Sequence, residues 1–389
     1  MDQRNSGVME KVLNQTHQKW IDAKLAFNTI GHEHDGEIQS LFSGLDFPNT
    51  RMEDWKYTRT QKLNQFQWEL NHAEVVSDPE FQSLNIVNTQ TRAGFFGCLN
   101  QMAVTDAFSL DIPANERFEE PFQFVLKNKK ELGWNQPSFQ FSVGENAKAK
   151  VVLHFIGENT GFCNGVVDIV VKAGGHLEID IIQDNHNDFF QILDIRVEQE
   201  ERAHCNVVTH ILNVGWVRNN LWMSLNGEFA HAGLSGFYLP QDGQLIDNHT
   251  VVDHRVPNCT SNELYKGVLY DKSRGVFNGK VFVRKDAQKT EAYQSNKNIM
   301  MSDEAIMDSK PELEIYADDV RCSHGSTTGQ FDEEALFYLR ARGLSAEGAK
   351  QLLVSAYVNE VIERSQNETV VQYVKQELSK RGRIIADEI

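Results

Sequence analysis

The chain has 389 residues, of which 40% are hydrophobic and 24% charged, a composition typical of a globular protein of two or three domains. Its formal net charge of -17 argues against nucleic-acid partners and against binding to anionic membranes. The polar N-terminus lacks a signal-peptide pattern, and no stretch approaches the roughly 20 apolar residues that span a bilayer. We therefore expect a cytoplasmic protein.

The five cysteines are widely spaced and form no CxxC motif. This usage is typical of reduced intracellular thiols and excludes a self-contained four-cysteine cluster site. The chain also contains no GxSxG motif, no P-loop and no GxGxxG motif after a strand. We therefore expect it not to be an enzyme, and any ATP hydrolysis in its process to belong to another subunit.

Residues 1–84 are predicted to form a mostly helical N-terminal domain, because apolar residues recur there at near-helical spacing. These residues are Val8, Val12, Trp20, Ala23 and Phe27. The segment 47–58, which follows a polar loop, is dense in charged and aromatic residues.

Residues 85–330 are rich in short alternating runs that predict β-strands. Four similar runs start 29, 27 and 28 positions apart, at 147–154, 176–183, 203–210 and 231–238. Second strands are predicted between them, at 166–171, 192–197 and 221–225. This period favours a β-solenoid. Periodicity alone supports an antiparallel sandwich or barrel about equally. Small interior residues at repeated offsets slightly favour the solenoid.

Residues 331–389 are predicted to be helical. The acidic residues 332–334 suit a helix start, and Gly343 suits a left-handed C-terminal cap. Ser345 is a plausible N-cap for a second helix, and a third is expected over 368–378. The apolar stripe expected on the second helix is Ala349, Leu352, Leu353, Ala356, Tyr357 and Val361. We expect these helices to cap the end of the strand region or to offer an apolar face to a partner.

Cys322 and His324 are the last cysteine and histidine of the chain. In an extended strand, residues two apart share a face, with Cα atoms about 6.6 Å apart. Thiolate and imidazole together suit an iron-sulfur cluster, Zn²⁺ or Cu(I). Two ligands do not close a site, so distant residues or a second chain would have to complete it. For an isolated pair, a packed cysteine beside an exposed histidine is the favoured interpretation.

His249, His254 and Cys259 form a lower-ranked metal candidate, because their spacing requires a turn before they can meet. Loop histidines with a structural cysteine are the better interpretation. The segment 274–298 is basic and rich in Asn and Gln. We interpret it as stacked amide ladders at solenoid corners, or as an edge that pairs with a partner.

The run from Cys259 to Gly343 resembles the shared C-terminal half of the SufB/SufD family of iron-sulfur cluster assembly proteins. The resemblance is carried by CTSNELYKGVL, SRGVFNGKVFV, DAQKTEAYQSNKN, SDEA, KPELEIYADDVRCSHG and DEEALFYLRARG. The earlier TRMEDWKYT is similar to a motif of the SufD branch. The resemblance extends from about Arg51 to the C-terminal helices.

This resemblance implies a right-handed parallel β-helix over 85–330, flanked by helical domains over 1–84 and 331–389, which decides between solenoid and sandwich. It implies a SufB-type partner at the β-helix end and a SufC-type ATPase on the C-terminal helices. The residues expected to dock the ATPase are Leu336, Leu339, Leu353, Ala356 and Tyr357. A homodimer of the isolated chain is an alternative assembly.

The resemblance further implies a scaffold function, in which Cys322 and His324 contribute interface ligands to a transient iron-sulfur cluster shared with the partner. We expect a thiolate of low pKa at Cys322, helped by His324 and by metal. Reduced flavin occurs in some family assemblies, and no residue here is assigned to it. The alternative is a purely structural adaptor. A carbohydrate-active β-helix enzyme fits poorly, because the adjacent Asp318 and Asp319 would face opposite ways.

Overall fold

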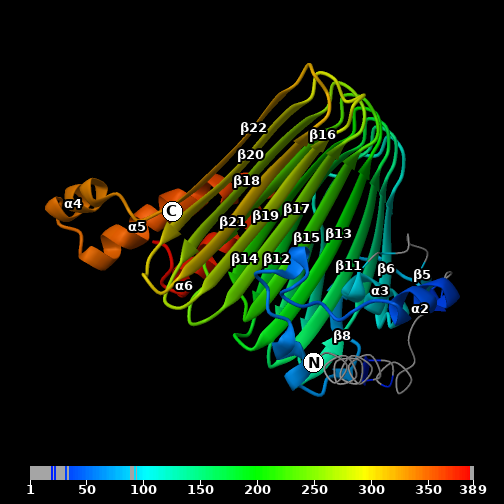
Figure 1. Cartoon of the computed structure of the whole chain (residues 1–389), viewed down its shortest axis with the longest axis horizontal. Helices are drawn as coiled ribbons and strands as arrows, with labels where there is room; N and C mark the ends of the chain where they lie inside the picture. The colour runs from blue at the N-terminus through cyan, green and yellow to red at the C-terminus, as the bar shows by residue number, and fades with distance from the viewer. Residues whose placement is uncertain are drawn as a thin grey trace, which may run out of the picture.

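A computed structural model describes residues 19, 20, 22, 31, 32, 35–87, 92 and 94–385 (Figure 1). Of the predicted N-terminal helical stripe, Val8, Val12, Ala23 and Phe27 lie outside these residues. Trp20 is buried and packs edge-on against Trp134, with ring centroids 4.7 Å apart. The division into three domains stays a prediction.

The N-terminal part combines short helices with short strands. Its elements are β1 (Gly31–His32), α2 (Asp35–Ser43), the 3₁₀ helices η1 (Glu53–Trp55) and η2 (Gln61–Gln65), β2 (Glu69–Leu70), β3 (Glu74–Ser77), β4 (Gln82–Ser83), β5 (Ile86–Val87) and α3 (Phe95–Met102). Strands β1 and β5 pair in parallel as a separate two-stranded sheet. A mostly helical region was predicted here, and the described part of it is more mixed.

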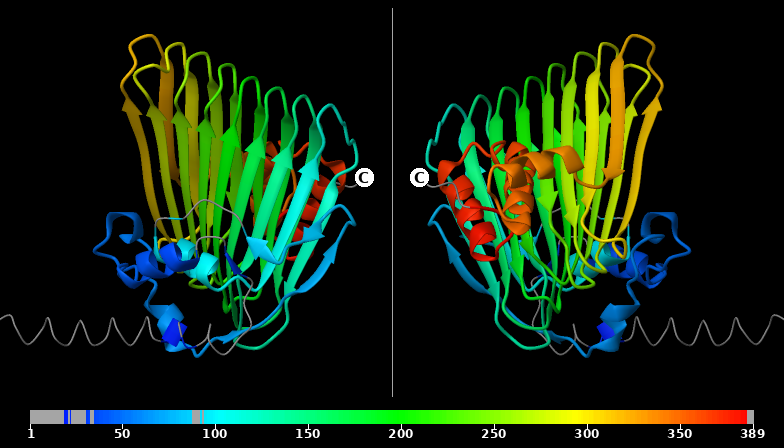
Figure 2. Two further views of the ribbon diagram at one scale, coloured as in Figure 1. Left: turned by 90° about the vertical axis from the view of Figure 1, so that its right-hand side faces the viewer. Right: turned by 90° about the vertical axis from the view of Figure 1, so that its left-hand side faces the viewer.

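The central region is a parallel β-solenoid of about eight turns, as predicted (Figures 1 and 2). A nine-stranded sheet contains β3 and then β7 (Phe122–Asn128), β10 (Lys148–Gly157), β12 (His176–Asn185), β14 (His204–Asn213), β16 (His231–Tyr238), β18 (Thr260–Leu269), β20 (Glu291–Met300) and β22 (Arg321–Gly329). An eleven-stranded sheet contains β2, β4, β6 (Asp106–Ile112), β8 (Gly133–Asn135), β9 (Pro137–Val143), β11 (Gly161–Val171), β13 (Phe189–Gln199), β15 (Trp216–Leu225), β17 (Leu245–His254), β19 (Arg274–Val283) and β21 (Ile306–Ile315). Parallel pairing excludes the antiparallel sandwich for this region.

The predicted strand repeats coincide with successive turns of the solenoid. The four runs become β10, β12, β14 and β16, and their inward side chains form one apolar core between the sheets. Val151, Ile179, Val207 and Leu234 occupy equivalent register positions within it. Stacking each turn on the next buries these β-branched and aliphatic side chains, which one turn could not bury alone.

The three C-terminal helices lie where they were predicted, and Ser345 and Gly343 take the predicted capping roles. They are α4 (Glu333–Ala341), α5 (Ala346–Ile362) and α6 (Glu368–Lys380). The Asp332 side chain accepts hydrogen bonds at the start of α4, Ser345 accepts one from Gly348 at the start of α5, and Gly343 has a φ of +97°.

These helices do not cap the solenoid end, so that expectation was wrong. Helices α5 and α6 fold back over the outer face of the nine-stranded sheet (Figure 2). Val358 and Val374 pack there with outward side chains such as Val208 and Phe237. The reason is that the outer face of the middle strands is itself apolar, and the helices bury it. Among the described residues, β22 therefore pairs with β20 alone.

The predicted apolar stripe of α5 was partly wrong. Ala349 and Val361 are buried as expected, but Leu352 is exposed. The buried positions include Val354 and Val358 instead, because the helix meets the sheet along a line shifted around its circumference.

A buried ion pair fixes the 47–58 segment to the eleven-stranded sheet. Arg218 Nη1 lies 2.9 Å from Asp247 Oδ2, and both side chains are almost completely buried. Thr58 donates a hydrogen bond to the same carboxylate, and the Arg218 guanidinium lies 3.9 Å from the centre of the Trp55 ring. Burial opposes charge at Asp247, yet His249 and Arg218 hold its pKa below the ordinary value.

No helix among the described residues has the length and apolarity needed to span a membrane.

Candidate functional site: the open end of the solenoid

The predicted ligands Cys322 and His324 lie on β22, the last strand of the nine-stranded sheet. In the parallel register, Cys322 is opposite Ala292 and His324 is opposite Gln294. Cys322 is half-buried and packs against the solenoid core, whereas His324 is exposed. Because residues two apart in a strand share a face, both belong to the side of β22 that continues the inner face of the sheet.

The lumen beneath this strand is polar along the register column that contains His324. Gln294 donates a hydrogen bond from Nε2 to Oε2 of Glu263 at 2.8 Å, and both side chains are buried. This register column contains Val207 and Leu234 in earlier turns. At the open end it contains Glu263, Gln294 and His324. Burial raises the pKa of Glu263 to about 7, while hydrogen bonds from Thr250 and Gln294 oppose the shift.

Further polar side chains fill the same end of the lumen. Tyr238 donates a hydrogen bond of 2.7 Å to Asn298 Oδ1, and Asn298 donates one of 2.7 Å to Asn296. Ser309 donates to Asn296 at 2.8 Å and its hydroxyl lies 2.8 Å from that of Ser326. Gln294, Asn296 and Asn298 thus line the inside of β20, whereas Gln288 lies in a turn, so the prediction of amide ladders at the corners was wrong for these three residues.

The predicted low pKa of Cys322 is not found in the metal-free chain. Burial raises the pKa of this thiol, and a backbone hydrogen bond at Ala292 only partly offsets the effect. A thiolate at Cys322 therefore requires a bound metal ion or a cationic partner group.

The lower-ranked candidates are not brought together. His249 Nε2 pairs with Asp247 Oδ1 at 2.9 Å. His254 is fully buried, with Nε2 2.9 Å from Ser261 Oγ, and burial lowers its pKa to about 4. Cys259 is buried and its thiol donates to a backbone carbonyl 3.3 Å away. The two histidines lie on strand β17 rather than in a loop.

The residues predicted to dock an ATPase lie in α4 and α5. Leu336, Leu339 and Leu353 are half-buried and Ala356 is exposed. Tyr357 instead contacts the body of the protein, where Lys266 Nζ lies 4.3 Å from its ring centre and 2.7 Å from its carbonyl oxygen. Sequence reasoning missed the two most exposed aromatic residues of α4, which are Phe337 at 75% and Tyr338 at 57%.

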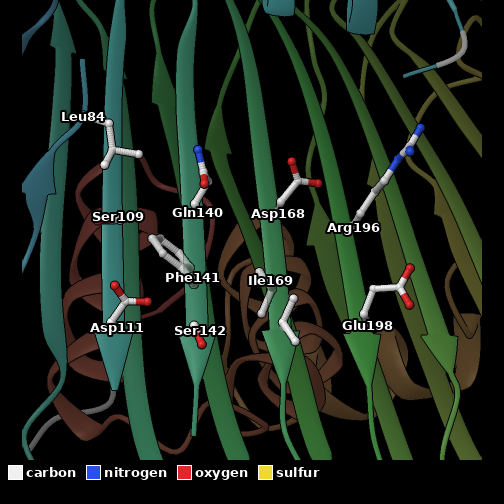
Figure 3. Close-up of a pocket in the computed structure, with 11 residues that line it drawn as sticks. Leu84, Ser109, Asp111, Gln140, Phe141, Ser142, Asp168, Ile169, Arg196 and Glu198 are labelled. Atoms are coloured by element: carbon white, nitrogen blue, oxygen red, sulfur yellow. The ribbon is translucent and has the colours of Figure 1, made fainter. Parts of the chain in front are cut away.

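A groove of about 390 Å³ lies on the outer face of the eleven-stranded sheet (Figure 3). Asp111, Asp168, Arg196 and Glu198 project into it from neighbouring strands (Figure 3). Arg92 is buried and bonds Asp168 at 2.5 Å, although burial still raises the pKa of this carboxyl. The groove contains neither Cys322 nor His324, and it forms no part of the open-end site.

The fold and this site define a class of protein, the β-solenoid subunits with a cysteine–histidine pair on an uncovered final turn. The sequence matches the family model described as "SUF system FeS cluster assembly, SufBD core domain" over residues 124–357. This match covers more than half of the chain, and the chain belongs to the SufBD family. The resemblance to the SufB/SufD family is thus confirmed.

Curated relatives agree with this assignment. The chain is 34% identical over 243 residues to the iron-sulfur cluster assembly protein SufD of Escherichia coli (strain K12), covering 61% of this chain and 57% of that protein. It is 28% identical over 281 residues to an iron-sulfur cluster assembly SufBD family protein of Synechocystis, covering 69% and 62%. The matches therefore span less than two thirds of both relatives. A SufBD family protein of Mycobacterium bovis is 29% identical over 360 residues, covering 87% and 90%.

Proposed function

We propose that this chain is a scaffold subunit for iron-sulfur cluster assembly that contributes Cys322 and His324 to a nascent cluster. The observation that carries the proposal is an incomplete ligand pair on an uncovered terminal turn. Among the described residues, the pair belongs to no group of three or more potential metal ligands. A second chain that covers the open end would supply the missing ligands. The cluster is cargo and leaves once assembled.

The open end is suited to pairing with a related solenoid, a SufB-type subunit. Within the part of the chain that the structure describes, β21 and β22 are the last strands of their sheets and no strand pairs with their outer edges. Exposed apolar side chains accompany these edges, with Ile306 at 49%, Ile315 at 40% and Tyr316 at 60% exposure. Long edges with apolar side chains favour strand addition by a partner. A homodimer of the isolated chain would use the same edges.

Docking of a SufC-type ATPase is proposed for α4 and the neighbouring part of α5. Among the described helices α4 to α6, α4 is the one with no buried residue, and it projects from the body (Figure 1). Phe337, Tyr338, Leu336 and Leu339 give it an apolar surface that an ATPase subunit would cover. Movement of α4 would reach the solenoid through α5, where Lys266 of β18 bonds Tyr357.

The chemistry proposed for the chain is ligation and not catalysis. A half-buried thiol and an exposed imidazole would bind iron as the partner closes over them, and the metal would then stabilise the thiolate. The buried Glu263 and Gln294 lie behind His324 and would orient it through the polar column. A reduced flavin in the complete assembly stays a prediction, with no residue of this chain assigned to it.

The test is a complex of this chain with a SufB-type and a SufC-type protein, carrying Cys322→Ala or His324→Ala. Both variants are expected to assemble but to lose most of the iron-sulfur absorption on reconstitution. Ser323→Ala, on the opposite face of β22, is the matched control and should retain it. If both ligand variants reconstitute normally and support cluster-dependent enzymes in cells, the ligand role is wrong and the adaptor function remains. If the wild-type chain forms no complex, the pairing itself is wrong.

A further inference from the structure

A second group of metal-ligand side chains lies at the start of β12 and β14, away from the open end. His176 Nε2 is 2.7 Å from Glu178 Oε1, and His204 Nε2 is 4.0 Å from the same oxygen. One ligand atom from each of the three residues lies within 4.8 Å of the others. They come together because the parallel register places His204 directly opposite His176.

The surroundings orient these three side chains. Asn206 Nδ2 lies 2.9 Å from Glu178 Oε1 and 2.9 Å from His204 Nε2. An amide N–H donates in both contacts, so His204 Nε2 accepts with its lone pair, and an ion bound at this nitrogen would replace that hydrogen bond. His231 stacks on the other face of the His204 ring, with centroids 4.5 Å apart. This stack holds the His204 ring without occupying its Nε2 atom.

Two imidazoles and one carboxylate are a recurrent ligand set for Zn²⁺ and for non-haem Fe²⁺, with further positions open to water. Glu178 is only 7% exposed, while His176 and His204 are 34% and 33% exposed, so the group is held from one side and open to solvent on the other. The rings of His176 and His204 stack with centroids 4.4 Å apart. The two rings are parallel to within 3°, so metal–nitrogen distances of about 2.0–2.1 Å require the rings to tilt towards each other.

The alternative explanation is a purely structural ladder, in which stacked rings and hydrogen bonds satisfy the sheet surface. Stacking accounts for the three aligned histidines. Hydrogen bonds from His176 and Asn206 satisfy one oxygen of Glu178. The metal-site interpretation rests on the further observation that two imidazole nitrogens and this carboxylate oxygen lie within 4.8 Å of one another. Glu178 is held among polar atoms from three strand positions, as a ligand carboxylate would be.

We propose that His176, Glu178 and His204 form a binding site for one divalent transition-metal ion, of which Fe²⁺ and Zn²⁺ share the required ligand chemistry. The site is distinct from Cys322. Four strand steps separate β14 from β22 in the nine-stranded sheet, which corresponds to about 19 Å. The proposal does not depend on the scaffold function, because it concerns ion binding by the chain alone.

The test is a titration of the tag-free, chelator-treated full chain with Co²⁺, followed by visible absorption. We expect one ion per chain in the wild type, with affinity at least roughly tenfold weaker in His204→Ala and in Glu178→Gln. Glu178→Gln keeps the shape of the side chain, so it remains informative if His204→Ala fails to fold. His186→Ala, which removes an exposed loop histidine, is the matched control and should bind as the wild type does.

A Cys322→Ser/His324→Ala double variant separates this proposal from the proposed function. Unchanged Co²⁺ affinity in the double variant supports a separate site. Loss of binding only in that variant would overturn the proposal, as would absence of stoichiometric binding or equal affinity in Glu178→Gln. Competition by anaerobic Fe²⁺ and by Zn²⁺ then identifies the preferred ion, and failure of both to displace Co²⁺ would also contradict the site.

Discussion

Gln294 donates a hydrogen bond of 2.8 Å to Glu263 inside the solenoid, one turn before the strand that carries His324. The contact lies where one register column of the inner face, which contains Val207 and Leu234 in earlier turns, changes from apolar to polar. A nearly buried carboxyl without a cationic partner is costly to ionise, and a glutamine can satisfy it in either state. The titratable Glu263 therefore lies in the same register column as His324, with Gln294 between them.

The pH dependence of the free energy of unfolding should reveal the titration of the Glu263 carboxyl. Its folded-state pKa of about 7 exceeds the ordinary value of 4.5, so the folded state binds more protons between these values. Its contribution is fully present below pH 4.5 and is lost as pH rises through 7. Glu263→Gln should therefore gain stability relative to the wild type across this window, by about 3 kcal/mol in total. Urea unfolding at pH 4.5, 6 and 8 measures the difference.

The control for that substitution is Glu304→Gln, whose exposed carboxylate pairs with Lys272. It is expected to change stability by less than about 1 kcal/mol at each pH. A constant offset between Glu263→Gln and the wild type would show that the Glu263 carboxyl does not titrate in this range.

Breaking the buried Arg218–Asp247 pair should release the 47–58 segment. Asp247→Asn removes one charge and leaves the Arg218 guanidinium buried without its partner, which costs about 3–5 kcal/mol in comparable pairs. We expect a lower midpoint of denaturant unfolding and faster proteolysis within 47–58. Glu200→Gln removes one side of the exposed pair with Lys172 and should cost less than about 1 kcal/mol. Equal unfolding midpoints for the two variants would show that the buried ion pair does not hold the 47–58 segment in place.

The proposed docking helix can be tested without disturbing the fold. Phe337 is 75% exposed, so Phe337→Ser should leave the free energy of unfolding within about 0.5 kcal/mol of the wild type. If α4 docks an ATPase subunit, the same change should weaken that complex by roughly 30-fold or more, as loss of an aromatic anchor does. Titration calorimetry with a SufC-type protein measures the affinity. Phe229→Ser, at another exposed aromatic position, should leave it unchanged.

The strand repeats and helix caps were predictable from local sequence, because their signals depend on neighbours along the chain. The run predicted at 231–238 is strand β16 itself, and Ser345 caps α5 as expected. Local sequence could not decide between a solenoid and a sandwich, because the strand periodicity is compatible with both. The decision required the family resemblance, since parallel and antiparallel strands share the same alternation.

The candidate sites were predictable only where one strand carries all the residues. Cys322 and His324 are two positions apart on β22, and the strand period alone placed them on one face. The group around Glu178 depends on register between strands. Aligning the predicted runs by their first residues puts His176 opposite Ala203, whereas the structure puts it opposite His204. A shift of one residue moves every side chain to the other face, so the group could not be found this way.

Gly233 makes room for the Asn206 side chain, which contacts two of the proposed ligand atoms. It lies opposite Asn206 in the parallel register, and a Cβ atom at this position would collide with the Asn206 amide. Because that amide is the end of a flexible side chain, Gly233→Ala should move it at a small cost in stability. The displaced amide then no longer competes with a metal ion for the lone pair of His204 Nε2, so Co²⁺ affinity should rise by roughly 2-fold to 10-fold. Asn206→Ala should have the same effect. Gly325→Ala, where a Cβ atom meets nothing within 4 Å, should leave binding unchanged. A stable Gly233→Ala chain with wild-type affinity would show that the Asn206 amide does not compete with the ion for these ligand atoms.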